Sequence, residues 1–189
     1  MVKKIVFLIV LILFLVLIGG GFFYWWQNQA DVKELNKNLP EGVKVVKSLI
    51  SNEYKVVNKI DSYEFKIPPE WQGIKEIEYF PQETEQGYTV SSIGLEGKEG
   101  AGRIVDIAQF QIEDSSINLE SWVKVYFEKS GLIDEFDKET VGNFEVVKTR
   151  EFVWSALGYV YFLKKDFSIY SIVCGSEDFV HYIITHGKW

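Results

Sequence analysis

Carboxylate side chains come closest to forming a site that could do chemistry. Glu76 and Glu78 occupy alternate positions of a predicted strand, and Glu83 and Glu85 follow in the next loop. Paired carboxylates can serve as acid and base or as calcium ligands. Alternate strand positions opposite apolar residues are also the ordinary solvated face of a sheet, so we expect no catalytic site here. Three further carboxylates fit such a role no better: Asp106, Glu113 and Asp114.

The histidines and the cysteine do not predict a metal site. Zinc sites use three or four ligands at regular spacing. His181 and His186 are five residues apart, on different faces of a predicted helix, and His181 aligns with Glu177 and Thr185 on the polar face. We therefore expect His181 to be a solvated surface side chain, and no metal or cofactor to be bound. Cys174 is the single cysteine and excludes an intrachain disulfide; its apolar strand favours a buried, unreactive thiol.

Two short motifs are incomplete. Ser92-Ile93-Gly94 carries the second half of a hydrolase G-x-S-x-G elbow, but Val90 stands where the first glycine belongs. Gly97-Lys98 is followed by Glu99, where a phosphate-binding loop has Ser or Thr. Neither motif supports an enzyme, so the sequence predicts a non-catalytic protein with no catalytic, cofactor-binding or metal-binding residues.

The overall charge excludes one class of partner. The 189 residues carry a formal net charge of −7 and a pI near 5.0. Nucleic-acid binding depends on lysine and arginine contacts to phosphate. The acidic balance therefore argues against a nucleic-acid partner.

The first residues predict where the chain is located. Ile5 to Trp26 is an uncharged, largely apolar run, long enough as a helix to cross a hydrocarbon core of about 30 Å. Lys3 and Lys4 place the amino terminus in the cytoplasm by the positive-inside rule. This predicts a cytoplasmic tail (1–4), a transmembrane signal-anchor helix (5–26) in the lipid bilayer, an extracytoplasmic linker (27–53) and an extracytoplasmic domain (54–189). A cleaved signal peptide, cut near Asn28-Gln29-Ala30, is the alternative.

The domain alternates between strand and helix patterns. Two helices are predicted, over Leu119 to Ser130 with Asn118 as its cap and from about Ser176 onward. Between hairpin-length connections we expect strands at 54–60, 63–67, 74–80, 88–95, 103–112, 144–150, 159–163 and 168–173. The order of strands, helix, strands and helix along the chain predicts an α+β fold with a mostly antiparallel sheet and helices packed on it.

Several segments resemble one known family. Tyr63-Glu64-Phe65-Lys66-Ile67-Pro68-Pro69-Glu70-Trp71 is similar to the opening of PsbP/Mog1-like domains, where an aromatic strand runs into a proline and then a tryptophan. The helix at Leu119 to Ser130, Val141-Gly142-Asn143 before a strand, and the closing Tyr182 to Trp189 segment follow in the same order. The resemblance covers residues 54–189. It implies an α/β/α sandwich and a non-catalytic binding or assembly role, and it transfers no functional residues.

Three functions follow as hypotheses. The first is a single-pass, membrane-anchored domain that binds another envelope protein. The second is an envelope hydrolase, which requires a deep pocket lined by His181 and acidic residues. The third is a small-ligand or ion-binding module that uses the acidic strand containing Glu76 and Glu78.

Overall fold

The computed structural model describes most of the chain after residue 30. The described residues are 14–16, 19–21, 23, 30–48, 51, 53–68, 73–85, 87–97, 103–130, 135–150 and 158–189. Trp71, which belongs to the family-like segment, lies outside them.

A seven-stranded antiparallel sheet forms the centre of the molecule. Its strand order is β4-β5-β6-β10-β9-β8-β7, and every pairing in it is antiparallel. The strands are β4 (Ile74–Glu85), β5 (Tyr88–Gly97), β6 (Arg103–Gln111), β7 (Phe136–Val141), β8 (Phe144–Thr149), β9 (Tyr159–Lys165) and β10 (Ser168–Cys174).

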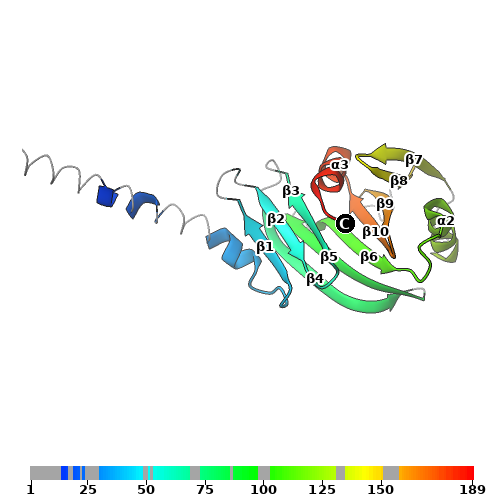
Figure 1. Cartoon of the computed structure of the whole chain (residues 1–189), viewed down its shortest axis with the longest axis horizontal. Helices are drawn as coiled ribbons and strands as arrows, with labels where there is room; N and C mark the ends of the chain where they lie inside the picture. Colours follow the sequence, from blue (N-terminus) through cyan, green and yellow to red (C-terminus); the bar gives the residue numbers. More distant parts are fainter. Residues whose placement is uncertain are drawn as a thin grey trace, which may run out of the picture.

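A smaller sheet packs against the large one. It contains β1 (Val43–Lys47), β2 (Tyr54–Asn58) and β3 (Tyr63–Ile67) in antiparallel order. Alternate residues of β3 are fully buried, as the clean alternation of its sequence predicts. Figure 1 shows this sheet at the amino-terminal end of the fold, beside β4 and β5.

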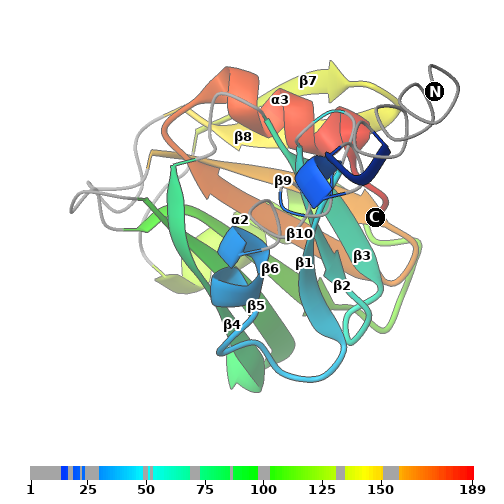
Figure 2. The same ribbon diagram turned by 90° about the vertical axis from the view of Figure 1, so that its left-hand side faces the viewer.

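Two helices complete the layers. α2 (Leu119–Ser130) packs against β8 and β9, and α3 (Glu177–His186) packs against β3, β7 and β10. Figure 2 shows α3 lying along the upper edge of the fold, next to β7 and β8. Ser176 caps α3 by accepting a hydrogen bond from the Phe179 amide at 3.3 Å. The predicted bounds of α2 and the predicted start of α3 are confirmed.

The large sheet separates two hydrophobic clusters. On one face, residues such as Ile107, Leu163 and Ile172 join the three-stranded sheet and α3. On the other face, Phe110 and Phe162 pack with α2. Because neighbouring residues of a strand point to opposite faces, every central strand contributes to both clusters.

Residues before β1 contribute to the first cluster. Residues 30–35 are helical, and Val32 and Leu35 are buried in the core. Asn36 then covers the open edge of β1: its side chain accepts a hydrogen bond from the Val45 amide at 2.7 Å and donates to the Val45 carbonyl at 2.9 Å. A strand edge covered in this way cannot pair with another chain at that residue.

The expected α/β/α sandwich is wrong. The face that this architecture would cover with helices alone is covered by a second sheet together with α3. The pattern of residues 54–67 correctly predicts two strands, but periodicity does not say which sheet a strand joins. The architecture therefore depends on which strands pair over long range in the sequence, and the local pattern carries no information about that pairing.

The membrane prediction is also wrong. Of the predicted span over 5–26, only residues 14–16, 19–21 and 23 are described, and the rest of it lies outside the described residues. Within the part of the chain that the structure describes, no helix combines the length and the apolar character needed to cross a membrane. A bilayer span needs about twenty consecutive apolar residues in one helix. This finding contradicts the predicted single-pass topology, bilayer contact and extracytoplasmic location.

Candidate functional site

A cavity of about 140 Å³ opens on the α2 side of the large sheet. Its floor is a row of small side chains that lie opposite one another across three strands. Ser92 of β5 pairs with Ala108 of β6, and Ala108 pairs with Ser171 of β10. Because directly opposed residues share one face of a sheet, these three small side chains leave space that larger residues would fill.

Neighbouring aromatic residues form the walls of the cavity. Phe80 lies opposite Ser92 on β4, Phe110 follows Ala108 by two residues on β6, and Tyr126 comes from α2. Phe110 and Tyr126 are buried and meet edge to face, with ring centroids 5.2 Å apart. Phe80 is 37% exposed and lies at the mouth. Three aromatic residues therefore contribute to the cavity lining.

Three carboxylates line the same cavity: Glu83, Glu85 and Asp106. The pairing of β4 with β5 shifts its register between Phe80 and Glu83, and such an irregularity bends a strand and redirects its side chains. The end of β4 consequently carries Glu83 and Glu85 to the rim, whereas the sequence predicts a loop there. Among its described lining residues, the cavity has no lysine, arginine or histidine, so its local charge is negative.

Tyr126 fixes one of these carboxylates. Its hydroxyl donates a hydrogen bond to Glu85 Oε1 at 2.8 Å. Burial of the ring and the adjacent carboxylate both raise the pKa of Tyr126 above its usual value. The hydroxyl therefore remains a neutral donor at physiological pH and holds Glu85 against the cavity wall.

The cavity carboxylates do not form a metal cage. Among the described residues, the one group of three metal-ligating side chains whose ligand atoms lie within 4.8 Å of one another is elsewhere, at Glu139, Glu177 and His181. Calcium needs six to eight oxygen ligands around one point. The wider spacing of Glu83, Glu85 and Asp106 suits a larger organic cation better than a bare ion.

The other carboxylates singled out from the sequence lie outside this cavity. Glu76 accepts a hydrogen bond from the Asn38 side chain at 3.3 Å. Asp114 accepts two hydrogen bonds from Ser116, which lower the pKa of this carboxyl group. The remaining two, Glu78 and Glu113, are also absent from the cavity lining.

Cys174 and Ser92 both lie within strands of the large sheet. Cys174 is fully buried in the core, as predicted, and burial raises the pKa of its thiol. Ser92 lies inside strand β5, so Ser92-Ile93-Gly94 forms no strand-to-helix elbow. Gly97 ends strand β5, and Lys98 and Glu99 of the incomplete phosphate-loop motif lie outside the described residues.

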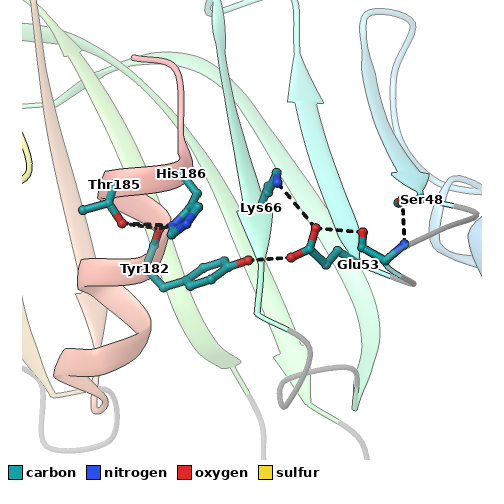
Figure 3. Close-up of polar contacts among 7 residues, drawn as sticks. Ser48, Glu53, Lys66, Tyr182, Thr185 and His186 are labelled. Carbon is teal, nitrogen blue, oxygen red and sulfur yellow. Dashed lines mark hydrogen bonds and ion pairs between the residues drawn. The ribbon is translucent and has the colours of Figure 1, made fainter.

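A second polar network joins α3 to the small sheet (Figure 3). Glu53 accepts hydrogen bonds from the Tyr182 and Ser51 hydroxyls, each at 2.8 Å, and pairs with Lys66 at 3.4 Å. These partners, with the Tyr182 hydrogen bond first, lower the pKa of Glu53. His186 stacks on the Tyr182 ring with centroids 4.2 Å apart. Because Glu53 is fully engaged by its neighbours, we interpret this network as structural.

A search with family models, a search of curated proteins and a search of solved structures each find no match to this chain. The resemblance to PsbP/Mog1-like domains is neither supported nor refuted by these comparisons and stays a prediction.

Proposed function

We propose that this chain is a non-catalytic binding domain whose α2-side cavity accepts a primary ammonium group. The observation that carries the proposal is the composition of the cavity, which combines three carboxylates with three aromatic rings and contains no basic side chain among its described lining residues. Carboxylates attract a cation, and each ring face adds about 0.5–2 kcal/mol of cation–π attraction.

The size of the cavity limits the ligand. Since one water molecule occupies about 30 Å³, 140 Å³ holds about five waters, or an alkylammonium of about five heavy atoms. The same ammonium chemistry is offered by a free amine and by the lysine side chain of a partner protein. The formal charge of −7 steers either cation toward the chain.

The chemistry of the cavity favours binding over turnover. Three serines line it: Ser91, Ser92 and Ser171. A serine nucleophile needs an adjacent base to activate it, and no histidine occurs among the described lining residues. The hydrolase hypothesis required a pocket at His181, yet His181 lines none of the three cavities described in this structure. The ammonium site is the form of the small-ligand hypothesis that the geometry supports best.

Calorimetric titration of the full chain tests this proposal. Butylammonium and Nα-acetyl-lysine methylamide represent the free amine and the lysine side chain, and butanol and the Nε-acetylated lysine are the neutral counterparts. We expect a Kd of about 1 mM for one or both cations. Tighter binding of the lysine derivative would identify a protein partner as the source of the group.

Two variants locate the binding. Asp106→Asn removes a carboxylate of the cavity, and Glu128→Gln removes the same charge from the exposed side of α2. We expect about tenfold weaker binding in the first variant, corresponding to 1.4 kcal/mol, and little change in the second. Equal binding of butanol, or equal loss in both variants, would refute the ammonium site.

A further inference from the structure

A separate cluster of potential metal ligands lies where α3 meets β7. Glu177 and His181 are four residues apart on α3 and therefore share one face of the helix. Glu139 of β7 approaches the same imidazole, with its Oε1 3.3 Å from His181 Nε2. Glu177 Oε1 is 3.8 Å from that nitrogen, and the three ligand atoms all lie within 4.8 Å of one another.

These distances match the spacing of ligands around a small metal ion. Zinc binds nitrogen and oxygen ligands at about 2.0–2.2 Å in tetrahedral geometry, so its ligand atoms lie about 3.3–3.5 Å apart. The separations of 3.3 and 3.8 Å at His181 are close to this value. Small side-chain movements would bring Glu139 and Glu177 to the same ion.

A buried hydroxyl lies beside the cluster, close to the Lys148 ammonium but with no acceptor for its own proton. Tyr161 of β9 is 0% exposed, and its hydroxyl makes no hydrogen bond of good geometry. Its ring meets the His181 ring edge to face at 6.5 Å. An unsatisfied buried donor close to two carboxylates marks a place where a further ligand, such as a metal-bound water, would accept its hydrogen bond.

Lys148 supports the cluster from outside. Its ammonium binds Glu177 Oε2 at 2.9 Å, which leaves Oε1 turned toward His181. The same ammonium lies 4.7 Å from the Tyr159 ring centroid and 5.1 Å from that of Tyr161. Partners outside the immediate ligands commonly fix the orientation of a ligating carboxylate, and Lys148 is placed to do so here.

From this geometry we infer that Glu139, Glu177 and His181 form a binding site for a divalent transition-metal ion such as Zn²⁺. Two carboxylates and one imidazole suit zinc and its neighbours in the first transition row better than calcium or magnesium, which prefer oxygen ligands alone. A bound ion would tie α3 to β7, the edge strand of the large sheet. This site is independent of the ammonium cavity, which lies on the opposite face.

The two histidines of α3 provide a matched test. The full chain is titrated with Zn²⁺ by calorimetry, and Co²⁺ absorption near 500–600 nm reports the ligand geometry. We expect Zn²⁺ binding that falls at least tenfold in His181→Ala and is unchanged in His186→Ala. Glu139→Gln, in β7, should weaken Zn²⁺ binding by a similar factor. This variant tests the third ligand without altering α3.

Several results would overturn the inference. Zn²⁺ binding that is absent, that is equally strong in His181→Ala, or that is lost in His186→Ala instead would exclude this ligand set. Equal affinity for Ca²⁺ and Zn²⁺ would exclude the imidazole as a ligand. Circular dichroism of each variant confirms that the comparison is made between folded proteins.

Discussion

The small sheet, on the α3 side of the large sheet, and the α2-side cavity surround their acidic residues differently. At the small sheet, carboxylates are held by lysines: Glu53 pairs with Lys66 at 3.4 Å, and Glu64 pairs with both Lys55 and Lys188. On the α2 face, the cavity carboxylates meet aromatic rings and hydroxyls, and no lysine or arginine occurs among the described lining residues. The first arrangement neutralises carboxylates within the fold, whereas the second gathers negative charge around one cavity.

Side-chain size explains why the two faces differ. The buried row on the α3 side contains Ile93, Ile107 and Ile172, which face one another across β5, β6 and β10. One residue along each strand, the opposite face carries small side chains instead. Close packing leaves few voids between large apolar residues, so the cavity lies on the α2 face, where the opposed side chains are small.

The largest effect is expected from removing a core ring on the closed face. Phe65 is fully buried between the two sheets, and Phe65→Ala should lower the free energy of unfolding by about 3–5 kcal/mol. Phe80 is 37% exposed at the cavity mouth, and Phe80→Ala should cost less than about 1 kcal/mol. Urea denaturation measures both. Similar losses in the two variants would remove the distinction between the packed core and the cavity mouth.

Filling the cavity should separate binding from stability. Ala108 lies at the centre of the cavity floor, so Ala108→Leu places a larger side chain in the space that a ligand would occupy. We expect butylammonium affinity to fall more than tenfold while the free energy of unfolding changes by less than about 1.5 kcal/mol. Retained affinity, measured by calorimetry, would place the amine elsewhere.

A smaller, pH-dependent effect is expected on the closed face. The pKa of Glu53 is lowered in the fold, chiefly by its hydrogen bond from Tyr182. A lowered pKa means that this stabilisation is present above the unfolded-state pKa near 4.5 and is lost as the pH falls through the folded value. Glu53→Gln should therefore cost about 1 kcal/mol at pH 7.

That difference should disappear at sufficiently low pH. Urea denaturation of both proteins at pH 7, 5 and 3 follows the change. A cost that is independent of pH would show that the network in Figure 3 does not depend on the charge of Glu53. Glu128→Gln, on the exposed side of α2, is the control for loss of one negative charge.

Local pattern predicted individual elements well. The apolar stripe of residues 119–130 gave the bounds of α2, and Asn118 caps it by accepting a hydrogen bond from the Ser121 amide at 3.0 Å. The final helix, predicted from about Ser176 onward, buries four apolar residues: Phe179, Val180, Ile183 and Ile184. Amphipathic periodicity is strong in such segments, because one side of the helix must be buried.

Edge strands were harder to predict. β7 has mostly exposed or half-buried residues and lacks the alternation of a half-buried strand, so its sequence contains no clear strand signal. β4 continues through Pro81 to Glu85, because proline is tolerated on the edge of a sheet. Both proposed sites use these segments: Glu139 lies in β7, and Glu83 and Glu85 lie at the end of β4.

Neither site could be assembled from the sequence alone. The carboxylates Glu83, Glu85 and Asp106 were visible as candidates, but their meeting with Tyr126 and Ser171 depends on strand order and register. A one-residue change of register would turn these side chains to the other face. The third metal ligand was likewise missed because it comes from a different part of the chain than the Glu177–His181 pair.

The most direct test of the ammonium cavity is a nuclear Overhauser experiment on the full chain with butylammonium. We expect contacts from the alkyl protons to the rings of Phe80, Phe110 and Tyr126, and their loss in Ala108→Leu. Contacts confined to other aromatic residues, or none at millimolar amine, would contradict it.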